Sequence, residues 1–333
     1  MSDLQLSLLN DFQRGFPLVS APFDVISRRL GLGVEEVLET LRRLTREGAI
    51  SRVGAVFCPN RIGVSTLAAM AVPKERLAEV AQQVNAYPEI NHNYEREHHF
   101  NLWFVAIATN PAHLERVLQD IELQTGLAVM RLPMVQDYHI DLGFDLRPTV
   151  GMAGRGRHKA AAPRALELDP LDYALVEAIQ EGLPLVARPY AAVGTLIGTT
   201  EADVLSRLAR LLDHGIIKRF GIVVRHHELG FRANAMVVLD IPDAHVDEVG
   251  RCIGASGLVN LCYQRPRRLP DWPYNLFCMI HGKDRSAVLE HLEHLRTQCG
   301  LTGFRCEILF SRQRFKQTAA RYVEAQPKIE AVA

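Results

Sequence analysis

The stretch LLNDFQRGFPLVSAPF, residues 8–23, returns later in the same chain as LVEAIQEGLPLVARPY, residues 175–190. Glycine, both prolines and the Leu-Val pair between them occupy the same places in the two copies. The register continues without a gap to GAISRVGAVF (48–57) and its counterpart GIIKRFGIVV (215–224). A long internal repeat of this kind indicates a duplicated structural unit. The chain is therefore two copies of one unit, and both copies are expected to share a fold.

The duplication resumes, after small insertions, in a second pair of motifs. FNLWFVAI (100–107) aligns with YNLFCMIH (274–281), and INHNYER aligns with VNLCYQR shortly before them. Between the copies lies a stretch rich in Gly, Ala, Arg and Pro without an apolar period, which is typical of a solvated linker. We therefore expect a winged helix-turn-helix at 1–62, a ferredoxin-like domain at 63–147, a linker at 148–168, a second winged helix-turn-helix at 169–229 and a second ferredoxin-like domain at 230–333.

The spacing of apolar residues predicts the elements inside each copy. In residues 22–47 they recur at three- and four-residue steps and are interrupted at Gly31–Gly33, which predicts a helix-turn-helix, followed by a hairpin wing. The remainder reads strand, helix, strand, strand, helix, strand, with an extra extended segment, QDYHIDLGFDL, at 136–146. This βαββαβ order is the ferredoxin-like unit. The expected class is α+β, a tandem repeat of winged helix-turn-helix plus ferredoxin-like domains.

Composition limits the functions that the chain can have. It has 333 residues and no net charge, with 38 Lys and Arg against 38 Asp and Glu, so it has no overall positive field for a polyanion such as DNA. No apolar run is long enough for a membrane span, and the N-terminus does not resemble a signal peptide, so a cytoplasmic location is expected. The six cysteines contain no C-x-x-C pair, which predicts reduced packing residues and no metal site.

A winged helix followed by βαββαβ resembles the Lrp/AsnC family of transcription regulators, in both halves. The helices that would read DNA begin with acidic residues, Glu35, Glu36 and Glu39 in the first copy and Glu201 and Asp203 in the second. These side chains repel phosphate, so DNA binding is disfavoured and a packing or dimerisation role is expected. A regulator that senses a heme-like or other small molecule remains the alternative function.

Polar and aromatic residues recur at equivalent strand positions of the two copies. Alternation places His92, Tyr94 and Arg96 on one face of a strand, and it does the same for Tyr263 and Arg265. The next strand begins with Asn101 and Trp103 in one copy and with Asn275 in the other. Buried polar groups need partners, so this pattern predicts a ligand that is flat, apolar across its face and anionic at its edges.

The copies have also diverged from each other. His98, His99 and His139 have no histidine counterpart in the second half, which is instead basic at RPRR (265–268) and SRQRFK (311–316). Imidazole suits proton transfer and arginine suits bidentate carboxylate binding. One half is thus expected to supply protons and the other to hold carboxylates.

At these residues the resemblance narrows. NHNYEREHHFNLWF and QDYHIDLGFDL in one half, with CYQRPRRLPDWPYNLFCMIHG and ILFSRQRFKQTAARY in the other, are similar to the two subunits of siroheme decarboxylase fused into one chain. The resemblance covers nearly the full length. It implies removal of carbon dioxide from two acetate side chains of siroheme, giving didecarboxysiroheme for heme biosynthesis, in an arrangement closer to that of denitrifiers. The resemblance leaves the oligomeric state open, and the expected form is either a homodimer or a monomer in which the two halves form an internal pseudo-dimer.

The residues are assigned roles on this basis. His98 is the leading proton donor and His139 the second, while Arg96, Arg265 and Arg312 are the expected carboxylate anchors. His92, Tyr94, Asn101, Trp103, Tyr263 and Asn275 complete the expected substrate site, and His99 is expected to be a surface residue. The conjugated macrocycle accepts the electrons of the broken C–C bond, so no organic cofactor is expected and the iron belongs to the substrate.

Overall fold

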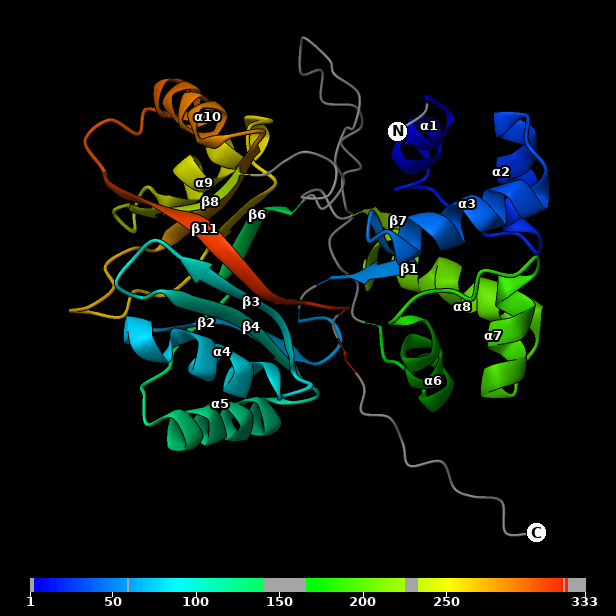
Figure 1. Ribbon diagram of the computed structural model, residues 1–333, viewed down its shortest axis with the longest axis horizontal. Helices are drawn as coiled ribbons and strands as arrows, with labels where there is room; N and C mark the ends of the chain where they lie inside the picture. Colours follow the sequence, from blue (N-terminus) through cyan, green and yellow to red (C-terminus); the bar gives the residue numbers. More distant parts are fainter. Residues whose placement is uncertain (1–2, 59, 141–165, 225–232, 320, 323–333) are drawn as a thin grey trace.

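Two lobes lie side by side in the computed structural model, which describes residues 3–58, 60–140, 166–224, 233–319 and 321–322 (Figure 1). One lobe is formed by the two helix-turn-helix units and the other by the two ferredoxin-like units. The first lobe contains α1 (Asp3–Asp11), α2 (Pro22–Leu30), α3 (Val34–Arg46), β1 (Ile50–Phe57), α6 (Pro170–Ile179), α7 (Pro189–Ile197), α8 (Glu201–Asp213) and β7 (Ile217–Val224).

The repeated glycine and proline signals position the helices of this lobe. Pro22 and Pro189 start α2 and α7, where proline's missing N–H costs no helical bond. Gly31 and Gly198 end the same helices with φ of 68° and 72°, a left-handed conformation that glycine adopts without strain. The predicted helix-turn-helix is confirmed in both copies.

The predicted hairpin wing is wrong. Each copy supplies a single strand, and β1 pairs antiparallel with β7 of the other copy, with Gly54 opposite Gly221. A lone strand leaves its backbone groups unpaired, and its repeat-equivalent partner satisfies them. Helices of both copies pack around this two-stranded sheet. They form one shared core, which includes Phe23, Leu41 and Phe220.

The second lobe contains a nine-stranded sheet in the order β5-β2-β4-β3-β11-β8-β10-β9-β6. Its strands are β2 (Val64–Met70), β3 (Ile90–Arg96), β4 (Leu102–Ala108), β5 (Met130–Pro133), β6 (Gln136–Ile140), β8 (Ala233–Asp240), β9 (Leu261–Gln264), β10 (Leu276–Gly282) and β11 (Arg305–Gln317). Its helices are η1 (Lys74–Arg76), α4 (Leu77–Asn85), α5 (Pro111–Thr125), α9 (Val246–Ala255) and α10 (Arg285–Gln298).

Strands cross between the two ferredoxin-like units in both directions. β11 pairs with β8 of its own unit over its first half and with β3 of the other unit over its second half. In the same way β5 pairs with β2, and β6, which follows it directly, pairs with β9. Since β5 and β6 are the two edges of the sheet and are consecutive in the chain, the sheet curls until its ends meet.

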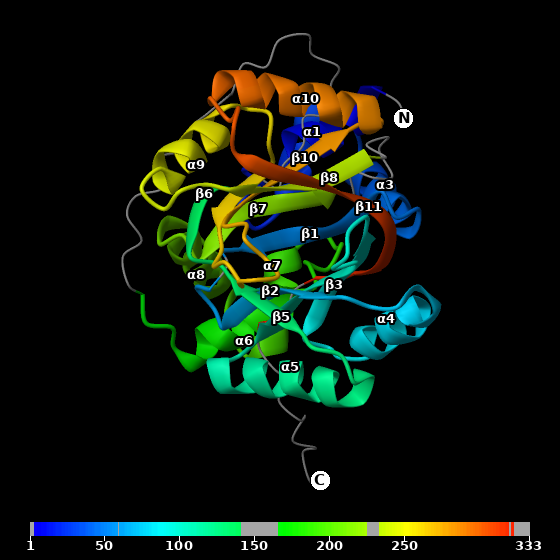
Figure 2. The same cartoon turned by 90° about the vertical axis from the view of Figure 1, so that its left-hand side faces the viewer.

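The curled sheet has an inner and an outer face. Helices α4 and α5 cover the outer face of the first unit, and α9 and α10 cover that of the second, so that helices flank the strands on opposite sides (Figure 2). The inner faces of both units meet in one cluster, which we call the inner core: Leu67, Ala69, Trp103, Leu132, Met236, Val238, Tyr263, Trp272, Tyr274, Phe277, Met279 and Leu309. The inner core is where the two repeats share side chains.

The α+β tandem-repeat class is confirmed, and two details complete the fold. The expectation that all six cysteines are free is wrong, because Cys252 of α9 and Cys299 after α10 form a disulfide, with Cα atoms 5.8 Å apart. Packing of these two helices brings together cysteines that are 47 positions apart, which no sequence motif signalled.

In the part of the chain that the structure describes, no helix is both long and apolar enough to cross a membrane. The extended segment predicted at 136–146 is seen as β6, and its residues 141–146 lie outside the described residues.

Candidate active site

One column of side chains follows the inner face of β3, as alternation predicts. The rings of His92 and Tyr94 stack with centroids 6.0 Å apart, and the Arg96 guanidinium carbon lies 5.9 Å from the centre of the Tyr94 ring. Asn93, between them, instead donates to the Ala81 carbonyl of α4 on the outer face. The three predicted residues therefore share one side of the strand.

The second unit repeats the arginine of this column by pseudo-twofold symmetry. Arg96 donates from Nη1 to the Leu309 carbonyl at 3.0 Å, and Arg265 donates from Nη1 to the Leu132 carbonyl. Each arginine thus crosses from its own unit to the other one. The Arg265 guanidinium carbon also lies 4.5 Å from the centre of the Tyr263 ring, which matches the arrangement of Arg96 and Tyr94.

Both arginines are buried cations without an acidic partner. Their exposed fractions are 7% and 9%, and neither forms an ion pair with a carboxylate of the described residues. The Nε atoms of both lack a hydrogen-bond acceptor. Burial lowers the pKa of Arg96 to about 10, so this arginine remains charged at neutral pH, and burial lowers the pKa of Arg265 as well. An uncompensated buried charge is costly to a fold, which favours an anionic ligand at these groups.

A third donor without a partner belongs to the same region. Trp272 is fully buried in the inner core, and its indole N–H has no acceptor among the described residues. Its ring lies 5.2 Å from that of Trp103 and 5.9 Å from that of Phe277, measured between centroids. Trp103 differs, because its indole N–H donates to the Phe100 carbonyl at 2.7 Å. Trp103 is therefore a satisfied core aromatic, and Trp272 is the unsatisfied one.

Asn101 and Asn275 both bind backbone groups, and their contact with the substrate stays a prediction. Asn101 accepts from the Val72 N–H at 3.0 Å and donates to the Val72 carbonyl at 2.8 Å. Asn275 makes the same pair of bonds to Ile241, at 3.0 and 2.9 Å. Each amide thus closes a backbone loop in its own unit, and its oxygen and nitrogen are both engaged there. Their recurrence in both copies reflects shared architecture.

His98 lies in the turn after β3 and points toward the inner core. Its Nε2 lies 2.8 Å from a carboxylate oxygen of Glu307, and its Nδ1 accepts from the Phe100 N–H at 2.9 Å. Because Nδ1 is an acceptor, the imidazole carries its proton on Nε2 and donates it to Glu307. The ring also meets Trp272 edge to face, with centroids 5.4 Å apart.

Glu307 has a second donor, Tyr274, whose hydroxyl binds its other oxygen. Burial lowers the pKa of His98 below its usual value, and the Glu307 carboxylate acts in the opposite direction. Burial, together with the bond to Glu307, raises the pKa of Tyr274. Sequence reasoning missed both Glu307 and Tyr274. The available signal for Glu307 was a lone carboxylate inside the apolar strand CEILF.

Two predicted residues lie elsewhere. Arg312 pairs with Glu95 and Glu97, at 3.8 and 3.4 Å, and its side chain is 55% exposed. Glu95 shares the outer face of β3 with Asn93, so Arg312 is on the opposite side of the sheet from Arg96. Alternation from Leu309 in the inner core and Phe310 on the outer face of the same strand places Arg312 on the outer face as well. Arg312 therefore does not lie beside Arg96, and its role as a carboxylate anchor stays a prediction.

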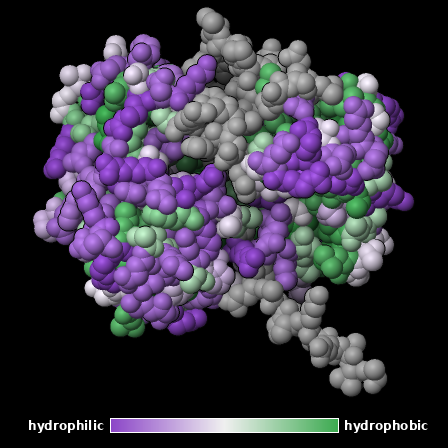
Figure 3. All heavy atoms as spheres, in the orientation of Figure 1, coloured by the Kyte–Doolittle hydropathy of each residue, from purple (hydrophilic) through white to green (hydrophobic). Residues whose placement is uncertain are grey.

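His139 is also separated from His98. It lies on β6 and pairs with Cys262 of β9, while its Cβ is close to Gly254 of the covering helix α9. The structure therefore does not bring the two predicted proton donors together. His99 is exposed, as expected, and the surface of this lobe is mainly hydrophilic in Figure 3.

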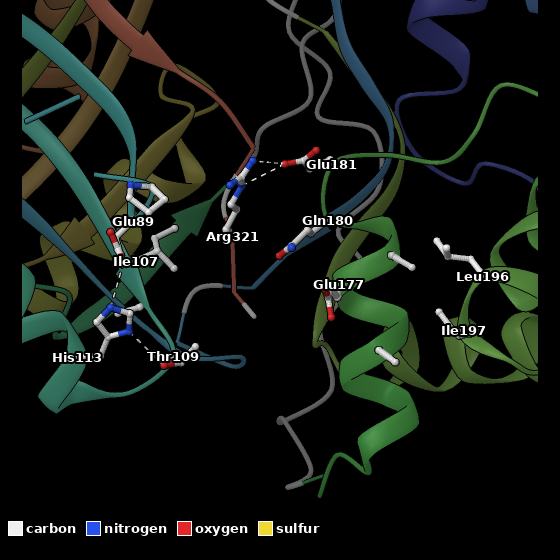
Figure 4. Close-up of a pocket in the computed structure, with 14 residues that line it drawn as sticks. Glu89, Ile107, Thr109, His113, Glu177, Gln180, Glu181, Leu196, Ile197 and Arg321 are labelled. Carbon is white, nitrogen blue, oxygen red and sulfur yellow. Dashed lines mark hydrogen bonds and ion pairs between the residues drawn. The ribbon is translucent and has the colours of Figure 1, made fainter. Parts of the chain in front are cut away.

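A separate hollow of 670 Å³ lies between the two lobes (Figure 4). His113 and Glu89, 3.0 Å apart, form one wall, and Glu177 of α6 and Glu181, which follows this helix, contribute to the other. Its cation Arg321 is already paired with Glu181 at 2.7 Å. Carboxylates dominate this hollow, so it is electrostatically unsuited to a polyanionic ligand. The inner core with its unpaired arginines is the better candidate site.

Comparison with known proteins matches both domain types of this chain to described families. The AsnC-like ligand binding domain family matches residues 61–139 and 228–316, and the siroheme decarboxylase NirDL-like HTH domain family matches residues 6–50 and 172–218. The siroheme decarboxylase NirDL subunit of Paracoccus denitrificans is 44% identical over 97% of this chain and 98% of its own length. The siroheme decarboxylase of Hydrogenobacter thermophilus is 29% identical over 95% and 93%, respectively.

Solved structures agree with these relatives. A crystal structure of the siroheme decarboxylase NirDL matches with a TM-score of 0.69 at 27% identity, covering 97% of this chain and 94% of that one. A second crystal structure of that enzyme, in complex with an iron-uroporphyrin III analogue, matches with a TM-score of 0.68. From the fused repeat, the inner core and these full-length matches, the chain belongs to the siroheme decarboxylase family.

Proposed function

We propose that this chain is a siroheme decarboxylase, a carboxy-lyase that converts two acetate side chains of siroheme to methyl groups and releases two molecules of carbon dioxide. The product would be didecarboxysiroheme, an intermediate for heme biosynthesis. Full-length relatives with this activity in their names support the proposal, and so does the similar crystal structure of the siroheme decarboxylase NirDL that holds an iron-uroporphyrin III analogue.

The observation that carries the proposal is the pair of buried arginines. Arg96 and Arg265 present guanidinium groups to an aromatic inner core, and their Nε atoms lack acceptors. A planar guanidinium matches a carboxylate bidentately, and aromatic walls suit the face of a macrocycle. A flat polycarboxylate such as siroheme would supply the missing acceptors and the missing negative charge together.

The side chains divide the reaction between them. The arginines hold carboxylates at the rim of the macrocycle, and the apolar inner core removes water from the carboxylate that leaves. When the C–C bond breaks, carbon dioxide departs and the electron pair stays on the methylene carbon, delocalised into the macrocycle. One proton must then reach that carbon to complete each methyl group. We assign this role to His98, whose partner Glu307 lies two residues before Leu309, and the Leu309 carbonyl accepts a hydrogen bond from Arg96.

The macrocycle is its own electron sink, so we propose that no organic cofactor takes part, and that the iron enters and leaves with the substrate. Both arginines are buried, so the substrate must displace covering side chains. The segment that carries Trp272 is the one we expect to move, since its indole N–H has no hydrogen-bond acceptor among the described residues.

The charges of the helix-turn-helix lobe count against a DNA-binding regulator. On α3, Arg42 pairs with Glu35 at 2.7 Å and Arg46 pairs with Glu39 at 2.8 Å. On α8, Arg207 and Arg210 both pair with the fully buried Asp172, at 2.8 and 2.5 Å. These arginines are therefore neutralised within the protein. A gel-shift assay with genomic DNA fragments at stated salt is expected to show no specific complex.

Anaerobic incubation with siroheme, followed by mass spectrometry, tests the proposal directly. Loss of two carbon dioxide units from the substrate is the expected result. The control is a relative that is active under the same conditions. If the siroheme mass stays unchanged after a much longer incubation than this relative needs, and the protein is shown to be folded, the proposal is rejected.

A further inference from the structure

We propose that Glu307 is a positioning residue that sets the tautomer and the proton affinity of His98, and that the second ferredoxin-like unit thereby completes a proton-delivery site begun by the first. The inference rests on the proposed decarboxylation for its kinetic consequences. Its structural part can be tested without substrate.

The contacts define a chain of three groups across the two units. His98 comes from the first unit, and both Glu307 and Tyr274 come from the second. One carboxylate oxygen of Glu307 accepts from His98 Nε2 at 2.8 Å, and the other accepts from the Tyr274 hydroxyl. With Nδ1 occupied by the Phe100 N–H at 2.9 Å, the imidazole is held at both nitrogens and cannot rotate freely. A carboxylate that orients an imidazole in this way is a recurring device of acid–base sites.

The arrangement exists on one side of the pseudo-twofold axis only. Leu309 and Leu132 are equivalent, because each accepts a bond from the buried arginine of the other unit. Glu307 stands two residues before Leu309, and the residue two before Leu132 is Met130. Methionine cannot orient or charge an imidazole, and the second unit has no histidine at the equivalent of His98. The two arginine sites are thus alike, whereas proton delivery is confined to one of them.

A single delivery site constrains the order of events. If only the acetate beside His98 receives a proton, then both decarboxylations use that place in turn. The half-processed tetrapyrrole must therefore be repositioned between the two steps. Glu307 is expected to affect both steps by the same factor.

The surrounding charges give the direction of each effect. His98 faces the Glu307 carboxylate and lies beside His99 in the same turn, while Arg305 lies 3.7 Å from Glu307. Glu307 favours the imidazolium, so its replacement by glutamine is expected to lower the pKa of His98. The Tyr274 hydroxyl draws negative charge away from His98, so Tyr274→Phe is expected to raise that pKa. The two variants should therefore move one titration in opposite directions.

Proton-detected nitrogen NMR on histidine-labelled, substrate-free protein measures both properties, with His98→Ala used to assign the signal. We expect the wild-type His98 to be protonated on Nε2 and not on Nδ1. Glu307→Gln should lower the pKa of His98 and Tyr274→Phe should raise it, and the exposed control Glu293→Gln should leave it unchanged. An unaltered tautomer and pKa in both Glu307→Gln and Tyr274→Phe would overturn the proposal. If one variant fails to fold, the sign of the pKa shift in the other still tests the proposal.

Kinetics test the same role in turnover. Glu307→Gln is expected to lower kcat about tenfold or more for both carbon dioxide losses, with little change in KM, and to shift the alkaline limb of the kcat profile to lower pH. The double variant with His98→Ala should be no slower than His98→Ala alone. A uniform loss without a shifted limb, or fully additive losses, would show that Glu307 only supports the fold. If the wild-type protein does not decarboxylate siroheme, the proposed function fails and the NMR results still decide the positioning role.

Discussion

Replacing Arg96 with methionine should weaken siroheme binding and leave the free energy of unfolding nearly unchanged. The reason is that the buried, unpaired charge of Arg96 is unfavourable for folding and favourable for binding a carboxylate. Methionine keeps the unbranched chain and removes the charge. The fold loses the bond from Nη1 to the Leu309 carbonyl, which is 3.0 Å long and worth about 1 to 3 kcal/mol for a charged donor. It also sheds an unpaired Nε, which costs about 1 to 3 kcal/mol, and a buried charge without a counterion.

The two contributions to stability nearly cancel, so the free energy of unfolding is expected to change by less than about 2 kcal/mol in either direction. Binding should respond differently. Loss of a charge-assisted contact to a carboxylate costs about 1.5 to 3 kcal/mol, which is about a 10- to 150-fold increase in the Kd for siroheme. Arg265→Met should behave in the same way, because its contacts are the symmetry equivalent.

Tryptophan emission reports both quantities. The chain has two tryptophans, Trp103 and Trp272, and both lie in the inner core, so a tetrapyrrole bound there should quench them. The same signal follows urea unfolding of this lobe alone. Arg46→Met, which removes an exposed arginine of the other lobe, is the matched control and should change neither. A variant at Arg96 that is several kcal/mol less stable and still binds siroheme with wild-type affinity would refute the reasoning.

Three further results are expected. His98→Ala should lower kcat by about 10²- to 10⁴-fold with an unchanged circular dichroism spectrum, and full activity would remove His98 from the mechanism. Burial lowers the pKa of His98 in the folded protein below its unfolded value near ~6.5, so the unfolded chain takes up the proton first. The free energy of unfolding should therefore fall as the pH drops below about 7, and this slope should be smaller in His98→Asn; equal slopes in urea titrations would contradict the assignment. Asn101→Ala and Asn275→Ala should each lower the free energy of unfolding by about 1 to 3 kcal/mol, because each leaves two backbone groups without their partner. The siroheme affinity of the folded fraction should stay the same. A loss of affinity without a loss of stability would show that these residues contact the substrate.

The sequence was sufficient for features that depend on local periodicity. The repeat, the helices bounded by Pro22 and Gly31, and the shared inner face of His92, Tyr94 and Arg96 all follow from spacings of two to four residues. Such spacings reflect backbone geometry, which is the same wherever an element packs. Family membership also follows, since motifs such as FNLWF and YNLF report the shared architecture that Asn101 and Asn275 maintain.

Tertiary structure decided which distant segments meet. β1 and β7 pair across the repeat although each was expected in a local hairpin, and β11 leaves its own unit to pair with β3. That crossing brings Glu307 to His98, more than two hundred positions away in the chain, and it also places Arg312 beside Glu95 and Glu97 of the first unit. Alternation along one strand states which side chains share a face. It contains no information about the strand opposite or about an inserted residue, because these are settled by backbone hydrogen bonding between segments when the whole sheet closes.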